Sequence, residues 1–554
     1  MTDDASPSAY ARRPQLPRTV LDWIRVFGPG AIMASLTIGT GELIFSSRGG
    51  ALFGFDILFV FVLILLLKWG LVFATSRHMI LTGVHPYERM MDLPGPRGWV
   101  PIMLLLMASV CLPVWISFHS GVLGNLISWI TGTRGLFHGA IDYFWAGCIL
   151  SATLILSSIG GYTVLERIQT VVVLAMVFCA GLTLILYSPD WAQVMLGMLP
   201  QKLAYPEWLP QKYPKIAEHS VWVETTRYVG VIGGAGFDYL AYTSWLREKK
   251  WGVLPARATP EKLAEIAADP QHEVRKWINA PLIDCLISFV MVAVFSMVFV
   301  ASGAMFLGRR EMVPDEDNML NLQAQFVTQI HPWLLPLYLI GAFLTMLGTL
   351  YGTIEIACSI ADGIVRSFDE NWTEHKARRL KHGVLIWCAP IALSIIAFLA
   401  VRQSSPQAAE VAASTGPQSV ASTDATSANL PEPPLLPKPR MLLAILTPVN
   451  LFTGVLSCGL IGVLVLWMDR RWLPPGLHPS RWLSGLNMIS ALVFLTLGVK
   501  GYWENENRLI AVSGILGTLL VALWIATVVA SKRNAAQVNP VAAAEVQESE
   551  DALS

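Results

Sequence analysis

Twelve long apolar stretches dominate this chain of 554 residues and leave few folds open to it. A transmembrane helix needs about 20 consecutive apolar residues, because in lipid every backbone polar group must be bonded within the protein. Charged residues make up only 14% of the chain, against about 25% in soluble domains. The sequence therefore predicts an all-α integral membrane protein with about twelve transmembrane helices, at approximately 26–48, 56–81, 100–130, 141–159, 164–187, 222–246, 279–307, 333–360, 383–401, 441–467, 482–500 and 508–530.

Two of these stretches, the first and the sixth, are interrupted in the same way. Each combines glycines, which unwind a helix at little cost, with a carboxylate, which lipid disfavours by about 2.5–3.5 kcal/mol at the bilayer centre. Glycines alone would fit close packing between helices equally well. Together with the carboxylates, paired breaks in two halves of a chain indicate a solute site at mid-membrane. The candidate substrate-binding residues are Gly39, Thr40, Gly41, Glu42, Ala235, Gly236 and Asp238.

Three further polar residues lie inside apolar stretches. His119 lies in the third stretch; a lone histidine there is usually only hydrogen-bonded, but histidine also titrates near neutral pH and can relay protons. Glu355, in the eighth stretch, is either a proton relay or a structural partner of its neighbours. Lys68, in the second stretch, either snorkels or pairs with a carboxylate. We take His119 and Glu355 as the candidates for proton coupling.

Composition and loop charge indicate where the chain lies and what it does not bind. Lys+Arg and Asp+Glu are equal at 39 each, so net charge does not favour nucleic acid as a partner. The seven cysteines all lie in apolar stretches without CxxC spacing, so we expect neither disulfides nor a zinc site, and no cofactor. Basic residues concentrate in the loops after the sixth, eighth and tenth stretches, which predicts cytoplasmic termini in the cell (inner or plasma) membrane.

Short motifs follow one another in a fixed order between about residues 28 and 471. They are Gly28-Pro29-Gly30, Gly161-Tyr162, Leu165-Glu166, Pro189-Asp190-Trp191, Leu199-Pro200 and Asp469-Arg470-Arg471. Each is weak alone, but the ordered set resembles the natural resistance-associated macrophage protein (Nramp) family of divalent-metal transporters. The chain looks like a divergent member that lacks the usual metal-binding motif. The resemblance implies a LeuT-like fold, with a five-plus-five inverted repeat of helices and two extra helices.

The resemblance also implies a division of the chain. We expect a cytoplasmic tail (1–25), a first repeat (26–187), an external loop (188–221), a second repeat (222–468) that contains a disordered external linker (403–440), a final helix pair (482–530) and a cytoplasmic tail (531–554). Solute would bind between the first and sixth helices, and one group of helices would move against the other to give alternating access.

The match departs from the family at the metal-binding positions. The family's metal-binding Asp and Asn correspond to Gly39 and Glu42, and its Met corresponds to about Gly236. A family glutamate that is linked to proton movement falls near His119. The soft thioether ligand is therefore absent, and a carboxylate stands at a new position, Asp238.

Two interpretations of the altered site remain open. Oxygen ligands suit hard cations such as Mg²⁺ and Mn²⁺, so the sequence favours a transporter of a divalent metal cation held by Glu42 and Asp238, with protons as the candidate coupling ion. Replacement of the family's Met by a glycine at about position 236 would also widen the cavity, which would then equally fit a sugar or another small polar organic solute. A membrane-embedded transferase is a remote alternative, because no HExxH motif or Gly-rich phosphate loop is present; we expect no enzyme.

Overall fold

The structure of the protein is a computed structural model that describes most of the chain. The described residues are 14–133, 136–187, 189–218, 220–254, 256–313, 335–369, 371–403, 441–504 and 508–538, and within these ranges the regular structure is entirely helical. The expected linker at 403–440 lies outside them from residue 404 onward, as do residues 1–13 and 539–554 of the two expected tails.

The membrane-length helices follow the apolar stretches closely. Ten segments of the described residues are long and apolar enough to cross a membrane. The longer elements are α3 (Pro29–Thr37), α4 (Thr40–Phe53), α5 (Leu58–Thr82), α7 (Trp99–Ile130), α8 (Ile141–Ile159), α9 (Tyr162–Tyr187), α13 (Val221–Val231), α14 (Gly236–Lys249), α17 (Asn279–Ser302), α19 (Leu335–Phe368), α20 (Glu374–Gln403), α22 (Met441–Asn450), α23 (Ser457–Trp472), α24 (Arg481–Glu504) and α25 (Arg508–Val538).

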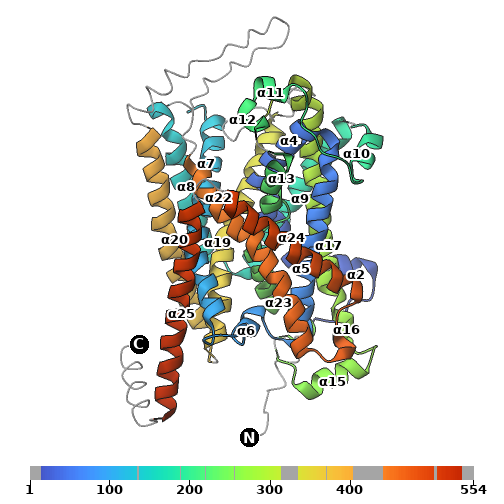
Figure 1. Cartoon of the computed structure of the whole chain (residues 1–554), viewed down its shortest axis with the longest axis vertical. Helices are drawn as coiled ribbons and strands as arrows, with labels where there is room; N and C mark the ends of the chain where they lie inside the picture. The colour runs from blue at the N-terminus through green and yellow to red at the C-terminus, as the bar shows by residue number, and fades with distance from the viewer. Residues whose placement is uncertain are drawn as a thin grey trace, which may run out of the picture.

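Short helices cover the two ends of this bundle. One end, here named the α15 face, carries α6 (Pro86–Met90), α15 (Pro260–Ala268) and α16 (Glu273–Trp277) (Figure 1). The opposite end, named the α11 face, carries α10 (Trp191–Gly197), α11 (Leu209–Lys212) and α12 (Pro214–Ala217). The remaining short helices are α2 (Val20–Ile24), η1 (Gly54–Ile57), η2 (Leu136–Gly139), η3 (Gly303–Leu307), η4 (Gly308–Arg310), η6 (Leu451–Leu456) and η7 (Pro475–Leu477).

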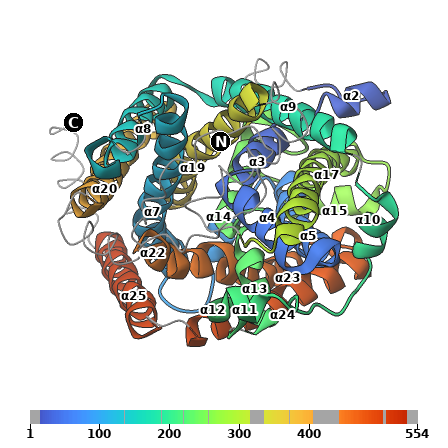
Figure 2. The ribbon, with the colours of Figure 1, turned by 90° about the horizontal axis from the view of Figure 1, so that it is seen from above.

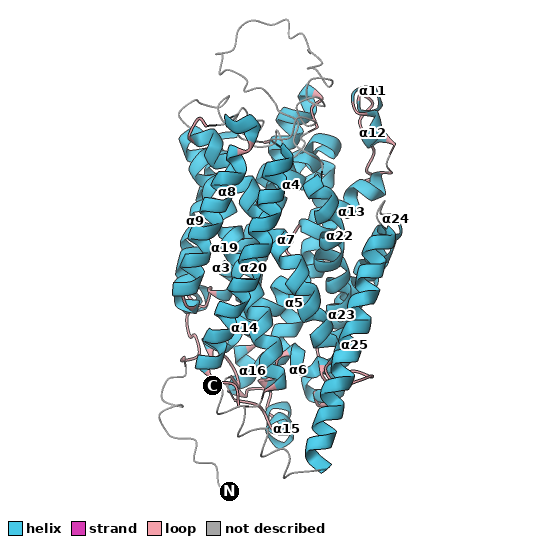
Figure 3. Cartoon of the chain, turned by 90° about the vertical axis from the view of Figure 1, so that its left-hand side faces the viewer, coloured by secondary structure: helices cyan, strands magenta, loops and turns pink. Residues whose placement is uncertain are grey.

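Two crossings are broken near the middle of the bundle, and both predicted breaks are thus confirmed. The first crossing consists of α3 and α4, separated at Ile38 and Gly39. The sixth consists of α13 and α14, separated at 232–235. Gly233 and Gly234 have φ values of +81° and +85°, which L side chains rarely adopt, so this break depends on glycine. In a side view, α4 and α13 lie in the upper half and α14 in the lower half (Figure 3).

The long helices form two groups around these breaks. Helices α7, α8, α19 and α20 pack against one another, whereas α4, α5, α14 and α17 form a second group with α3 and α13. Seen from above, the two groups lie side by side (Figure 2). Helix α19 joins them, because it packs against α3 and α14 as well as α7. The broken segments therefore lie where the two groups meet.

Candidate functional site

Both carboxylates that the sequence singled out occupy the same position of a half-helix. Glu42 is the third residue of α4, and Asp238 is the third residue of α14. Unpaired backbone N–H groups give the first turn of a helix a partial positive charge, which stabilises a carboxylate there. The two carboxylates therefore lie at the same position in the first turn of two half-helices, and both helix starts lie in the interior of the bundle.

The Glu42 carboxylate joins the two breaks and is fully buried, with 0% of the residue exposed. One oxygen, Oε1, accepts a hydrogen bond from the Gly233 N–H at 3.1 Å. The other, Oε2, accepts from the hydroxyls of Ser296 at 2.7 Å and Ser46 at 3.2 Å. Three donors from α4, α17 and the second break therefore satisfy a carboxylate that lipid alone would reject.

Asp238 is less enclosed than Glu42. Its Oδ2 accepts a hydrogen bond at 2.7 Å from the N–H of Ala235, the residue before α14 begins. Its other oxygen, Oδ1, accepts no hydrogen bond from the part of the chain that the structure describes, and the residue is only partly buried. Asp238 therefore has an oxygen that is available to a solute.

Gly234 of the second break lies between Asp238 and Thr37, which is the residue just before the first break. A Cβ added to Gly234 would lie 2.9 Å from Asp238 Oδ2 and 3.1 Å from the hydroxyl of Thr37, the last residue of α3. Since Glu42 contacts the neighbouring Gly233, both carboxylates meet the same short segment. The two breaks thus face each other across 232–235.

Neighbouring helices close tightly on the remaining predicted residues. A Cβ added to Gly39 would overlap the side chain of Thr349 on α19. A Cβ added to Gly41 would overlap Val231, and one added to Gly236 would overlap Ser457. Ala235 is half-buried beside Gly236, and the side chain of Thr40 lies outside what the structure describes. These glycines therefore allow the helix to unwind, and they also let its backbone pack closely against neighbouring side chains, including the hydroxyl-bearing Thr349 and Ser457.

Lys68 and Tyr239 hold the backbone carbonyls of the second break. The Lys68 ammonium, on α5, donates to the carbonyls of Ile232 at 2.8 Å and Gly234 at 2.5 Å. The Tyr239 hydroxyl donates to the Gly233 carbonyl at 2.8 Å. Lys68 is 0% exposed, so the expected snorkelling is wrong, and its partners are carbonyls rather than the carboxylate that we predicted as the other possibility.

Several of these partners were not predicted. Ser46 lies four residues after Glu42 on α4, and this helical spacing was the one signal that would have found it. Ser296 lies 254 residues from Glu42 in the sequence, and Tyr239, although it directly follows Asp238, is not marked as a partner of the break by any local pattern. Contacts of this kind depend on how helices from different parts of the chain pack together.

His119 lies on α7 in an aromatic environment. It is 6% exposed and stacks on Trp115, with ring centroids 5.4 Å apart. Its Nδ1 has no hydrogen-bond partner among the described residues. Trp115 in turn donates to the Thr453 hydroxyl of η6 at 3.2 Å. His119 is therefore a buried titratable group with one unused ring nitrogen.

Glu355 lies in a separate ion pair. Lys381 of α20 places its Nζ 2.9 and 3.1 Å from the two carboxylate oxygens, and the Ser157 hydroxyl of α8 donates at 2.6 Å. Lys381 also donates to the Gly160 carbonyl at 3.1 Å. The structure thus joins Glu355 to α8 and α20, and none of these contacts involves Glu42 or Asp238.

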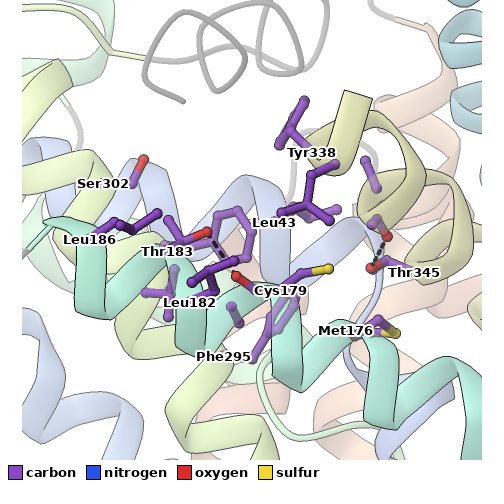
Figure 4. A pocket seen from close by; sticks show the side chains of 16 residues that line it. Leu43, Met176, Cys179, Leu182, Thr183, Leu186, Phe295, Ser302, Tyr338 and Thr345 are labelled. Atoms are coloured by element: carbon purple, nitrogen blue, oxygen red, sulfur yellow. Dashed lines mark hydrogen bonds between the residues drawn. The ribbon is translucent and has the colours of Figure 1, made fainter. Parts of the chain in front are cut away.

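An apolar pocket lies beside the breaks, lined mainly by aliphatic and aromatic side chains of α4, α9, α17 and α19, among them Leu43 and Phe295 (Figure 4). Its two threonines, Thr183 and Thr345, donate their hydroxyls to carbonyls of their own helices at 2.8 and 2.7 Å. The lining offers little to a charged solute, so we place the candidate site at the breaks and not in this pocket.

The arrangement at the breaks offers oxygen ligands to a small cation. These are the Asp238 and Glu42 carboxylates and the hydroxyls of Thr37 and Thr349, around a backbone that glycines keep accessible. Among the described residues, no cluster of three or more His, Cys, Asp or Glu side chains could hold a metal. Any cation bound at the breaks would therefore combine carboxylates with hydroxyls, carbonyls or water.

Comparison with known proteins agrees with this architecture. The family described as natural resistance-associated macrophage protein-like matches residues 30–414. A crystal structure of a variant manganese transporter from Eremococcus coleocola matches with a TM-score of 0.63 and 14% identity, covering 94% of this chain and 98% of that chain. The same transporter in complex with an aromatic bis-isothiourea substituted compound gives 0.63 and 13%, covering 94% and 97%. At this identity the likeness shows the fold. No curated protein matches the chain.

Proposed function

Because the chain belongs to the natural resistance-associated macrophage protein-like (Nramp) family, we propose that it is a secondary active transporter of a divalent metal cation. The family resemblance predicted from the motifs and the all-α membrane fold are confirmed. Two structural neighbours are crystal structures of a manganese transporter, and we extend divalent-metal transport from that protein to this chain. In this proposal the solute binds at mid-membrane and alternating access carries it across.

One observation supports the proposal most strongly: two carboxylates from two broken helices meet the same segment inside the membrane. Glu42 binds the Gly233 N–H, and Asp238 lies against Gly234 with one oxygen available. Intramembrane carboxylates that face the interior of a helix bundle are typical of ion pathways. We propose Asp238 as the first ligand and Glu42 as the second, with Gly39, Thr40, Gly41, Ala235 and Gly236 forming the wall of the site.

The ligand chemistry favours a hard cation. Carboxylate and hydroxyl oxygens suit Mg²⁺ and Mn²⁺, and no thioether is among the proposed ligands. Mg²⁺ in particular keeps several of its waters and is usually held by only one or two carboxylates, which fits this site. Lys68 supplies one positive charge for the two carboxylates, and a neutral sugar would add none, so the organic alternative is not favoured.

We infer that His119 is the proton-coupling group and that the α15 face is cytoplasmic. His119 has an unused buried nitrogen, whereas Glu355 is engaged by Lys381. The segment between α14 and α17, which is rich in Lys and Arg, lies on the α15 face, and loops of this composition favour the cytoplasmic side. A His119→Gln variant should still take up metal, but an inward proton gradient should no longer increase the rate of uptake. If the gradient accelerates uptake in the variant as much as in the wild type, His119 is not part of the proton pathway.

Uptake into liposomes tests the proposed function. The purified full-length chain should accumulate Mn²⁺ or Mg²⁺, and excess sugar should not inhibit it. Asp238→Asn should reduce uptake by about tenfold or more, because a charge-assisted contact contributes about 1.5–3 kcal/mol. Asp362→Asn is the matched control. Asp362 accepts a hydrogen bond from Trp372 and pairs with Arg366, away from the breaks, so loss of its charge should leave uptake unchanged. Wild-type liposomes that accumulate neither ion would refute the proposal.

A further inference from the structure

The second break contains a group of backbone carbonyls that is built to hold a positive charge. The positive φ values of Gly233 and Gly234 remove this segment from the helix. The carbonyls of Ile232 and Gly234 converge on one point, which the Lys68 Nζ occupies at 2.8 and 2.5 Å. Converging carbonyl oxygens of an unwound segment are the arrangement by which membrane proteins coordinate small monovalent cations.

Lys68 is fully buried, and several of the groups around it stabilise a positive charge. The two nearby carboxylates, Glu42 of α4 and Asp238 of α14, both interact with its charge, and Cys458 of α23 lies near it. The ring of Phe494 on α24 lies 6.0 Å from Nζ. The stem of Lys68 packs against Gly233, where an added Cβ would lie 3.3 Å from the Lys68 Cδ. A buried ammonium without such partners would be strongly destabilising.

We propose that Lys68 is a tethered cation, which fills the carbonyl site of the second break in place of a bound monovalent ion. The ammonium fixes the shape of the break and keeps one positive charge beside the two carboxylates. With Glu42, Asp238 and Lys68 all charged, the site carries one net negative charge. For transport, which rests on the proposed function, the consequence is that no Na⁺ or K⁺ is needed to complete the site.

Chemical rescue tests the tethered cation independently of transport. In detergent, Lys68→Ala should unfold at a lower temperature than the wild type, because the Ile232 and Gly234 carbonyls lose the ammonium as a donor and Gly234 keeps only the longer contact with the Tyr239 hydroxyl at 3.3 Å. The shortened side chain leaves space for n-propylammonium, which should restore most of the lost unfolding temperature. Tetramethylammonium carries the same charge but has no N–H to donate, so it should not. Equal effects of the two ions would overturn the proposal.

A second variant separates the ammonium from the packing of its stem. Lys68→Met keeps a side chain of similar length but donates no hydrogen bond, so it should also be less stable than the wild type. A methionine variant as stable as the wild type would overturn the proposal, including the case in which the alanine variant does not fold. Lys500→Met is the control, because Lys500 is a half-exposed lysine on α24 that pairs with Glu504.

A third test measures the wild-type protein with and without Na⁺. Replacing Na⁺ by N-methylglucamine at constant ionic strength should leave both the unfolding temperature and the rate of Mn²⁺ uptake unchanged. A requirement for Na⁺ in either measurement would contradict a site that is already filled. If wild-type liposomes take up no divalent metal, the proposed function fails, while the rescue of Lys68→Ala still decides whether Lys68 is a tethered cation.

Discussion

Glu42 and Asp238 each occupy the third position of a half-helix, but they differ in burial and in the number of hydrogen bonds that their carboxylates accept. Glu42 is fully buried and accepts three hydrogen bonds, whereas Asp238 accepts one and retains an oxygen that no described residue contacts. On this geometry Glu42 first holds the two breaks together, and it reaches a solute only when its donors rearrange. Asp238 is available without rearrangement, so we assign it the first contact with the cation.

A neutral substitution at Glu42 should therefore affect stability as well as transport. Glu42→Gln places an amide N–H₂ among three donors, so at least one charge-assisted hydrogen bond is lost, and we expect the free energy of unfolding to fall by about 1.5–3 kcal/mol. Thermal unfolding of the purified variant measures this loss. Ser296→Ala, which removes a single donor, should have a smaller effect. A Glu42→Gln protein as stable as the wild type would mean that these hydrogen bonds contribute little.

At the residue scale, the sequence predicted the charges but not their partners. Glu42 and Asp238 stood out because a carboxylate is conspicuous inside an apolar stretch. Lys68 was equally conspicuous, but its carbonyl partners lie more than 160 residues away and depend on an unwound backbone that no local pattern describes. Ser296 gave no signal, because a serine in a membrane helix usually bonds its own backbone.

The breaks are the elements on which the site depends, and glycine is essential to one of them. In Gly233→Ala the added Cβ would lie 2.8 Å from Leu65 Cδ2 in a backbone region that disfavours L side chains. We expect a loss of about 1–2 kcal/mol or more in stability, measured by thermal unfolding. Gly181→Ala is the control: this glycine lies inside α9 with open space around it, so alanine should stabilise slightly. Equal effects at both positions would contradict a special role for the break.

The elements themselves were well predicted, since length and hydropathy suffice to locate a membrane helix. Helix α7 runs from Trp99 to Ile130, where the apolar stretch predicted 100–130, and α8 spans 141–159 as expected. The sequence did not predict the π-helical segments η3 and η6. Gly454 of η6 packs directly on the Gly230 backbone beside the second break. Such π-helical segments arise from packing between helices, and the sequence of one apolar stretch alone does not predict that packing.

For the whole molecule, the α15 face is closed by contacts between the two halves of the chain. Asp284 of α17 accepts hydrogen bonds from the N–H groups of Gly28 and Gly30 at 2.9 and 2.7 Å, and from the Tyr242 hydroxyl at 2.7 Å. Lys249 of α14 pairs with Glu166 of α9 nearby. On our proposal, release of solute toward this face requires α3 and α14 to separate from α17 and α9.

Locating a bound metal tests the central claim most directly. Crystals of the wild-type protein grown with Mn²⁺ should show an anomalous scattering peak within about 2.6 Å of an Asp238 carboxylate oxygen, between the starts of α4 and α14. Asp238→Asn crystals grown in the same way should lack this peak. Mn²⁺ bound elsewhere in the bundle, or a peak that persists without the Asp238 carboxylate, would contradict a metal site formed by the two broken helices.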